Sequence, residues 1–380
     1  MTASTAARLL VDVDVHHTWA NDAELLPYLD SQWRRYFEAV GSTLPGATLY
    51  SRAGGSAMRL DSIPPTGGAP GSDYSTLCAQ HLDLFGVDRA VLTFGFGTQG
   101  AYFHPAAAVA LCRAANDWTL DRWLTGADPR LYGLVMLPVG DPSAAAAELR
   151  RVGGHPRVVG ALVVPNPHMH PLGHPVHDPI FDVACEIGVP IVTHVGTEFS
   201  NTGTLTAGGL PTTKPEYYTL LDQPGMHHFT SLLAGGALVR FPTLRVLFNE
   251  HGFCWAPWIL LGLDARYAAL RRERPELDRL PSEYFREQIW MATQPFETGA
   301  GRRALTGLLE TLDGIEARLC FASDYPHWDA DPPDQIAARL PRDWRDRIMG
   351  GNAAELFGWQ EVVDETIKLS GSRTTTERVQ

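Results

Sequence analysis

Residues 11–17 read VDVDVHH, a short apolar run that carries two carboxylates and two imidazoles. Strand alternation places its three valines on one face and Asp12, Asp14 and His16 on the other. Carboxylate oxygens and imidazole nitrogens are common ligands of Zn²⁺ and related divalent ions. The stretch therefore indicates metal chemistry close to the end of a strand.

Three further apolar runs end in side chains of the same kinds. His194 lies near the end of VPIVTHVG, His251 near the end of LRVLFNEHG and Asp324 within LCFASDYPH. Each has an ordinary structural explanation by itself, because buried histidines often only make hydrogen bonds and Ser-Asp-Tyr-Pro can form a turn. Four separate runs with ligand-type residues at the same end favour one shared metal site.

These runs belong to a repeated pattern of apolar, β-branched stretches separated by helix-like segments. The apolar stretches are residues 9–15, 89–96, 131–138, 158–165, 189–196, 244–252, 288–296 and 319–327. Eight such repeats predict an α/β protein built as a (β/α)₈ TIM barrel, in which the carboxyl ends of the strands meet at one mouth. An open doubly wound sheet is the alternative, although no GxGxxG turn follows the first stretch.

The barrel pattern predicts a single domain over residues 1–365. Residues 41–73 are rich in Gly, Pro and Ser and interrupt the pattern after the first strand, so we expect an insertion loop there. Residues 366–380 read as a flexible C-terminal tail. Because the insertion leaves the strand that carries the first ligand-type residues, we expect it to cover the mouth of the barrel.

The bulk composition argues against several classes of function. The chain has 380 residues, an apolar fraction of 44%, a charged fraction of 19% and a formal net charge of −12, as in a globular protein with a large core. Its basic residues form no long cluster, which argues against a nucleic-acid partner. No run reaches the ~20 apolar residues of a membrane span. Five scattered cysteines without CxxC spacing indicate reduced thiols, so we expect a cytoplasmic protein.

The same residues carry a resemblance to a known family. The pair Asp14-x-His16 and the runs GVPIVTHVG, FPTLRVLFNEHGFCWAPWILLGLD and FASDYPHWD are similar to the amidohydrolase-related group of the amidohydrolase superfamily. That group includes aminocarboxymuconate-semialdehyde decarboxylase, γ-resorcylate decarboxylase and 5-carboxyvanillate decarboxylase. The resemblance covers roughly residues 9–358 and implies a distorted (β/α)₈ barrel with one catalytic divalent metal ion.

The resemblance implies a role for each strand-end residue. Asp14, His16, His194 and Asp324 would be the metal ligands. His251 would be the acid/base histidine, with Asp324 as the second catalytic candidate. Relatives often have Glu or His at the position of Asp14, and because Asp is one methylene shorter than Glu, Asp14 would ligate the metal weakly or through water.

The scarcity of lysine sets the number of metal ions that the resemblance implies. Two-metal members of the superfamily bridge their ions with a carbamylated lysine at the end of the fourth strand. The fourth apolar stretch here ends GALVVPNP, and the only lysines of the chain are Lys214 and Lys368. One divalent ion is therefore expected, Zn²⁺ first and Mn²⁺ as the alternative, with no organic cofactor.

Four further residues are candidates for substrate binding. The run PHMHPLGHPVHD holds four histidines, of which His177 is the candidate for substrate contact, with a second metal site or a structural role as alternatives. His228 opens the helix before the sixth strand, and His327 follows the turn of the last apolar stretch. Arg52, in the insertion, would pair with a substrate carboxylate in bidentate fashion.

Glu250 precedes His251 directly in the sequence. If His251 faces the mouth, alternation turns Glu250 to the opposite face, where it would support the site from behind or form a structural pair.

The leading hypothesis for function is a metal-dependent, non-oxidative decarboxylase of a small aromatic or unsaturated carboxylic acid. His251 or Asp324 would protonate the ring carbon before CO₂ leaves. The second hypothesis is a hydrolase that uses metal-activated water on an amide, lactone or C–C bond. An inactive barrel that serves as a binding module is the third. The resemblance also implies a homodimer that binds a small-molecule substrate.

Overall fold

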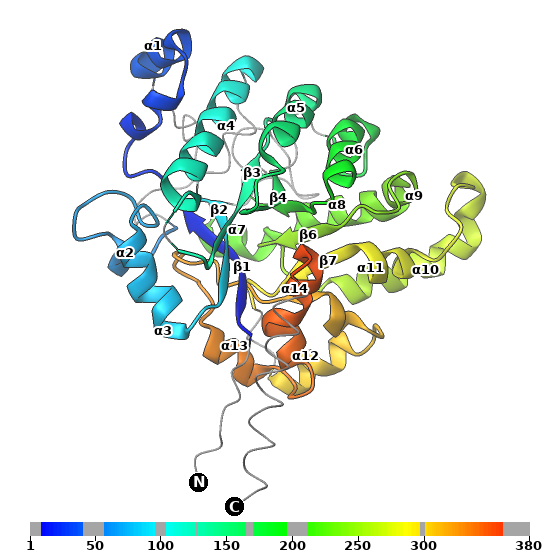
Figure 1. Ribbon diagram of the computed structural model, residues 1–380. Helices are drawn as coiled ribbons and strands as arrows, with labels where there is room; N and C mark the ends of the chain where they lie inside the picture. Colours follow the sequence, from blue (N-terminus) through cyan, green and yellow to red (C-terminus); the bar gives the residue numbers. More distant parts are fainter. Residues whose placement is uncertain are drawn as a thin grey trace, which may run out of the picture.

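The centre of the protein is a sheet of eight parallel strands that curls into a barrel (Figure 1). The computed structural model describes residues 9–40, 57–95, 104–126, 128–164, 170–195, 212–296 and 301–359. The strands are β1 (Val11–His17), β2 (Arg89–Phe94), β3 (Leu131–Met136), β4 (Val158–Val163), β5 (Ile191–His194), β6 (Val246–Asn249), β7 (Ile289–Ala292) and β8 (Leu319–Cys320). Each strand pairs in parallel with the next one along the chain.

The loop after β8 returns to β1 and closes the barrel through backbone hydrogen bonds. The amide of His16 donates to the carbonyl of Tyr325 at 2.7 Å. The amide of Asp324 donates to the carbonyl of Asp14 at 3.0 Å. The sequential strand order and this closure confirm the predicted (β/α)₈ TIM barrel.

Most of the helices surround the sheet on its outer side, and one, Lys214–Leu220, lies at the mouth of the barrel (Figure 1). They are α1 (Ser31–Val40), α2 (Tyr74–Leu77), α3 (Asp83–Phe85), α4 (Pro105–Thr119), α5 (Pro142–Val152), α6 (Asp178–Ile187), α7 (Lys214–Leu220), α8 (Asp222–Ala234), α9 (Ala237–Arg240), α10 (Ala256–Leu270), α11 (Pro281–Gln288), α12 (Arg302–Leu309), α13 (Pro333–Arg339) and α14 (Asn352–Phe357). Their starts follow capping chemistry: Asp141 accepts from the amide of Ala144 at 3.0 Å, and Pro142 takes the first position of α5. None of the described helices has the length and apolar character to span a membrane.

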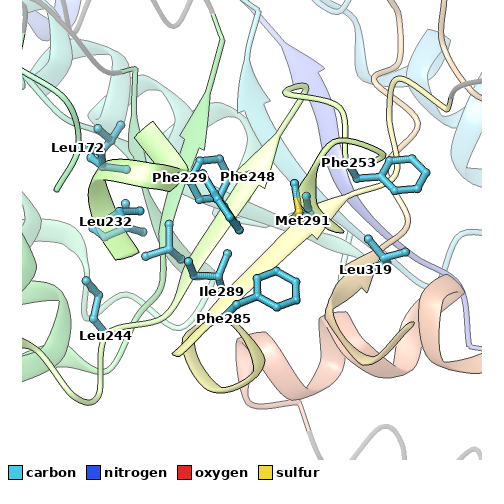
Figure 2. Close-up of a cluster of buried hydrophobic side chains, with 14 of the residues drawn as sticks. Leu172, Phe229, Leu232, Leu244, Phe248, Phe253, Phe285, Ile289, Met291 and Leu319 are labelled. Atoms are coloured by element: carbon cyan, nitrogen blue, oxygen red, sulfur yellow. The ribbon is translucent and has the colours of Figure 1, made fainter. Parts of the chain in front are cut away.

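Apolar side chains between the strands and the helices form the outer part of the core (Figure 2). Phe229 of α8 lies between Phe248 of β6 and Phe285 of α11, with ring centroids 5.6 Å and 5.8 Å from its own. Each buried phenylalanine contributes about 1.5–3 kcal/mol relative to an exposed one. This packing fixes β6 in place directly before the residues that reach the barrel mouth.

The observed strands are shorter than the predicted ones. β6 ends at Asn249 and β8 ends at Cys320. Glu250 and Asp324 follow in loops with left-handed backbone, at φ values of 55° and 61°. Because the chain leaves strand geometry there, alternation does not determine where these two side chains point.

The described part of the predicted insertion, residues 57–73, runs beside the loop after β8. Met58 forms an antiparallel bridge with His327, which places the segment at the mouth. Residues 41–56, with the predicted substrate ligand Arg52, lie outside the described residues. The predicted domain boundary at 365 and the tail 366–380 also lie outside them.

Candidate metal centre and active site

Four side chains predicted as metal ligands converge at the carboxyl ends of β1, β5 and β8. Asp14 and His16 come from β1, His194 is the last residue of β5, and Asp324 lies in the loop after β8. A ligand atom of each lies within 4.8 Å of the ligand atoms of the other three. All four side chains are buried.

The distances between donor atoms match the spacing around a single ion. His194 Nε2 lies 3.2 Å from Asp14 Oδ2, and His16 Nε2 lies 2.8 Å from Asp324 Oδ1. Ligand atoms that are each about 2.1 Å from one ion lie about 3.0–3.4 Å apart. His194 Nδ1 donates to the carbonyl of Val195 at 2.6 Å, so its Nε2 faces the other ligands.

Most donor atoms of this group have no hydrogen-bond partner. Both oxygens of Asp14, both ring nitrogens of His16, Nε2 of His194 and Oδ2 of Asp324 are buried and, apart from ion-pair contacts within the site, have no hydrogen-bond partner among the described residues. Leaving such groups unpaired costs about 1–3 kcal/mol each. A divalent cation would satisfy all four side chains at once, so the residues present fit a metal ion.

A buried carboxylate behind β1 positions two of these ligands. Asp12 Oδ1 accepts hydrogen bonds from the amides of Asp14 at 3.1 Å and Ser323 at 3.0 Å. His81, from the helical turn after α2, places its Nε2 2.7 Å from Asp12 Oδ2. Asp12 therefore ties β1 to the residue directly before Asp324 and does not itself enter the ligand group.

Burial and charge act in opposite directions on the pKa values of the ligands. Burial alone would raise the pKa of Asp14, but His194 and His16 hold it below its usual value. Burial alone would lower the pKa of His194, yet Asp14 raises it to about 10. The pKa of Asp324 is likewise lowered against burial by His327 and His16. The carboxylates therefore stay ionised, as metal ligands must, and a metal ion would displace the proton of His194.

Glu250 also reaches this group, contrary to the expectation from alternation. Its Oε2 lies 3.4 Å from His194 Nε2. With His16, Asp324 and His327 it forms a second set of possible ligands, whose atoms lie within 4.8 Å of one another. Burial and the charge of Asp324 raise the pKa of Glu250 well above its usual value. The left-handed backbone at Glu250 turns its side chain toward the mouth.

His251 lies outside this group of side chains. It is fully buried, and neither ring nitrogen has a hydrogen-bond partner among the described residues. Its ring packs 5.6 Å from that of Phe248, and a Cβ added to Gly225 of α8 would come within 2.7 Å of its Cβ. Burial lowers the pKa of His251 well below its usual value. Its acid/base role, implied by the family resemblance, stays a prediction.

A cavity of about 170 Å³ adjoins the ligands. His16, His194, Glu250, His327 and Asp329 form its charged and imidazole side. The apolar and aromatic residues that line it are Phe94, Leu162, Val164, Val195, Tyr217, Tyr218 and Leu221. A cavity of about 150 Å³ holds a benzene ring, so this one accommodates a single ring with small substituents.

The other candidates for substrate binding lie in two places. His327 lines the cavity with Nδ1 2.5 Å from Asp324 Oδ1, and although burial opposes it, Asp324 raises the pKa of His327 to about 9. His177 and His228 are buried, and neither is among the described residues that line the cavity. Burial lowers the pKa of His177 to about 4 and that of His228 to about 3. The amide of Leu172 donates to His228 Nδ1 at 3.1 Å, which gives that ring a structural partner.

Comparison with known proteins gives the context for this geometry. A family model described as Amidohydrolase matches residues 13–359. Decarboxylase orsB of Emericella nidulans is 29% identical over 225 residues, which cover 57% of this chain and 64% of that protein. Gamma-resorcylate decarboxylase of Polaromonas sp. is 23% identical over 286 residues, which cover 73% of this chain and 85% of that protein.

A solved structure shares the fold at lower sequence identity. It is 5-carboxyvanillate decarboxylase from Novosphingobium aromaticivorans, complexed with manganese and 4-hydroxy-3-methoxy-5-nitrobenzoic acid. The identity is 17%, the TM-score is 0.66, and the match covers 94% of this chain and 98% of that chain.

Proposed function

The chain belongs to the amidohydrolase family, and on that premise we propose that it is a metal-dependent, non-oxidative decarboxylase of a small aromatic carboxylic acid. The observation that carries the proposal is the buried set of Asp14, His16, His194 and Asp324 beside a cavity sized for one substituted ring. The relatives support it, because those named above are decarboxylases, including enzymes of γ-resorcylate and 5-carboxyvanillate.

Asp14, His16, His194 and Asp324 would hold one divalent ion. When bound, the ion supplies Lewis-acid chemistry and a template for the substrate carboxylate. None of the described residues that line the cavity is a lysine or arginine, and Arg52, the guanidinium proposed to pair with that carboxylate, lies outside the described residues.

His327 and Asp324 are the pair proposed to deliver the proton. His327 faces the cavity, and its Nδ1 contacts Asp324 Oδ1 at 2.5 Å, which orients the imidazole toward a substrate ring. Protonation of the ring carbon by such a positioned acid precedes the loss of CO₂. His251, the other proposed acid, follows the end of β6, is fully buried and is not among the described residues that line the cavity.

Aromatic side chains on the cavity wall support an aromatic substrate. Tyr217 and Tyr218 line the cavity, and Tyr218 packs edge-to-face with Trp328 at a ring-centroid distance of 5.4 Å. Aromatic rings prefer such offset or edge-to-face partners. A planar substrate ring would extend this arrangement.

The proposal includes three finer features. The ion is Zn²⁺ or Mn²⁺, both of which suit imidazole and carboxylate ligands. The protein is a homodimer, which is supported by the exposure of Trp258 (71%) and Leu261 (52%) on α10. It acts in the cytoplasm, which is supported by five cysteines that are all free.

The test is an assay of CO₂ release from hydroxybenzoates and carboxyvanillate-type acids, with metal-free protein and with protein reconstituted with Mn²⁺ or Zn²⁺. The reaction is run in ¹⁸O-labelled water. We expect metal-dependent CO₂ release and a phenolic product without ¹⁸O. A panel in which no acid releases CO₂, while an amide or lactone takes up ¹⁸O, would replace the decarboxylase with a hydrolase.

A further inference from the structure

Among the described residues that line the cavity, Glu250 is the one carboxylate that contacts the donor atom of a predicted ligand without being a predicted ligand itself. We propose that Glu250 is a fifth protein ligand of the divalent ion and that it shifts the preference of the site toward Mn²⁺ over Zn²⁺. The inference rests on the metal centre of the proposed function and does not depend on which reaction that centre performs.

The first support is the distance between Glu250 and His194. Glu250 Oε2 lies 3.4 Å from His194 Nε2, close to the 3.2 Å that separates the same nitrogen from Asp14 Oδ2. Both distances fall in the range of about 3.0–3.4 Å expected for two ligands of one ion. The carboxylate of Glu250 is therefore about as close to His194 Nε2 as the carboxylate of Asp14 is.

The second support is that Glu250 also lies near two other predicted ligands. Its carboxylate oxygen is within 4.8 Å of ligand atoms of His16 and Asp324. The two possible ligand sets share His16 and Asp324. Asp14 and His194 belong to the first set and Glu250 and His327 to the second, and the 3.4 Å contact between Glu250 and His194 joins the two sets.

The third support is that the backbone is anchored on both sides of Glu250. Before it, Asn249 Nδ2 donates to the carbonyl of Val13 at 3.2 Å, which ties the end of β6 to β1. After it, Trp255 Nε1 donates to the carbonyl of His251 at 2.8 Å. These two bonds hold the left-handed residue between them, so the direction of the Glu250 side chain is set before a metal arrives.

The resulting ligand set has a definite metal preference. As a ligand, Glu250 would add a third carboxylate to Asp14 and Asp324, beside the imidazoles of His16 and His194, and its 3.4 Å contact with His194 is what joins it to the first ligand set. Zn²⁺ favours four ligands with nitrogen and sulfur among them, whereas carboxylate-rich sites with more ligands suit Mn²⁺. Five protein ligands with three oxygens therefore favour Mn²⁺ and leave a position for substrate.

The experiment measures the dissociation constants of Mn²⁺ and Zn²⁺ by calorimetric titration of metal-free protein. The variants are Glu250→Gln, which keeps size but weakens ligation, and Glu250→Asp, which keeps the carboxylate. His251→Asn is the matched control, because it changes the adjacent residue, which lies outside the ligand group. We expect Glu250→Gln to weaken Mn²⁺ binding at least about tenfold and Zn²⁺ binding less, while His251→Asn stays near wild type.

Three results would overturn the inference: Mn²⁺ affinity of Glu250→Gln equal to wild type, equal losses in Glu250→Gln and His251→Asn, or a second Mn²⁺ equivalent that only Glu250→Gln removes. Circular dichroism of the metal-free variants checks folding, and Glu250→Asp should recover part of the Mn²⁺ affinity. Should the protein bind metal as expected but release no CO₂ from any acid, the proposed reaction fails and the ligand assignment stands.

Discussion

The ends of β1 and β6 each carry two adjacent polar side chains. Strand alternation accounts for the directions of the two side chains in β1 but not for those of the two that follow β6. In β1, His16 faces the ligand group and His17 faces the other way. His17 is satisfied there, because Nδ1 donates to the carbonyl of Thr93 and Nε2 contacts Thr119 Oγ1, both at 2.9 Å. The strand continues through His17, so the pleat sets both directions.

At β6 the strand stops one residue too early for the same rule to apply. Asn249, the last residue of β6, turns its side chain toward the Val13 carbonyl of β1, so continued alternation would turn Glu250 away from the ligands and His251 toward them. Instead Glu250 adopts a left-handed conformation and faces the ligands, and His251 is buried without a hydrogen-bond partner among the described residues. Alternation therefore predicts side-chain direction only inside the hydrogen-bonded strand. Beyond its last paired residue, a turn decides which polar group reaches the mouth.

The largest effect is expected when the two β1 histidines, His16 and His17, are mutated one at a time. His16→Ala removes a metal ligand, so we expect it to weaken metal binding by more than about 100-fold and to abolish activity. His17→Gln removes two buried hydrogen bonds, so we expect it to lower the free energy of unfolding by about 1–3 kcal/mol and to leave metal affinity near wild type. Metal titration and denaturant unfolding measure the two quantities. Equal loss of metal affinity in both variants would contradict the assignment of His16 to metal binding and of His17 to stability.

A smaller effect is expected at the carboxylate that supports β1 from behind. Asp12→Ala frees the amides of Asp14 and Ser323, so we expect metal affinity to fall about 10- to 100-fold. Asn116→Ala is the control, since Asn116 makes buried hydrogen bonds to Met136 far from the ligands. We expect that variant to lose stability without losing metal affinity. If both variants lose stability alone, Asp12 has only a structural role.

His251→Asn sharpens the comparison at β6. A positioned general acid is worth about 10²–10⁴-fold in rate. The family resemblance implies an acid/base role for His251, so we expect kcat to fall about 100-fold or more, with metal content unchanged. A kcat that changes less than about tenfold would show that His251, which is buried and is not among the described residues lining the cavity, has only a structural role.

The fold and the convergence of the four predicted ligands were accessible from the sequence because both depend on regular features. Apolar stretches repeat along the chain, and Asp14, His16, His194 and Asp324 sit at the ends of such stretches. The direction of the Glu250 side chain depends on the left-handed turn after β6, and the spacing of apolar residues does not predict that turn. The polar residues at the end of β6 indicated only that this position could matter.

The cavity lining was harder to predict for a different reason. Tyr217 and Tyr218 come from α7, which follows a long interruption of the barrel pattern, so no strand periodicity points them at the mouth. Asp329 lines the cavity from the loop after β8 and could have been found in FASDYPHWD as a second acid. The histidine-rich run suggested substrate contact at His177, which is buried and is not among the described residues lining the cavity, so that contact stays a prediction.

The smallest expected effect concerns pH and the histidines buried away from the metal centre. Burial lowers the pKa of His228 to about 3, so the folded state favours the neutral ring. That contribution to stability is present above the unfolded pKa near ~6.5 and is lost as the pH falls toward the folded value, at about 1.4 kcal/mol per pH unit. We expect the denaturant concentration at the unfolding midpoint to decrease as the pH falls below ~6.5. For His228→Gln we expect this decrease to be less steep. Parallel curves for the two proteins would contradict this assignment.

Elemental analysis of the purified protein tests the metal centre most directly. The protein is expressed with Mn²⁺ and Zn²⁺ supplied together, dialysed, and measured beside His194→Ala, which lacks one predicted ligand. We predict close to one equivalent of divalent metal per chain in the wild type and close to none in His194→Ala, because unpaired donor atoms converge at a single point. Wild-type protein without bound metal, or with metal that His194→Ala retains in full, would contradict the account.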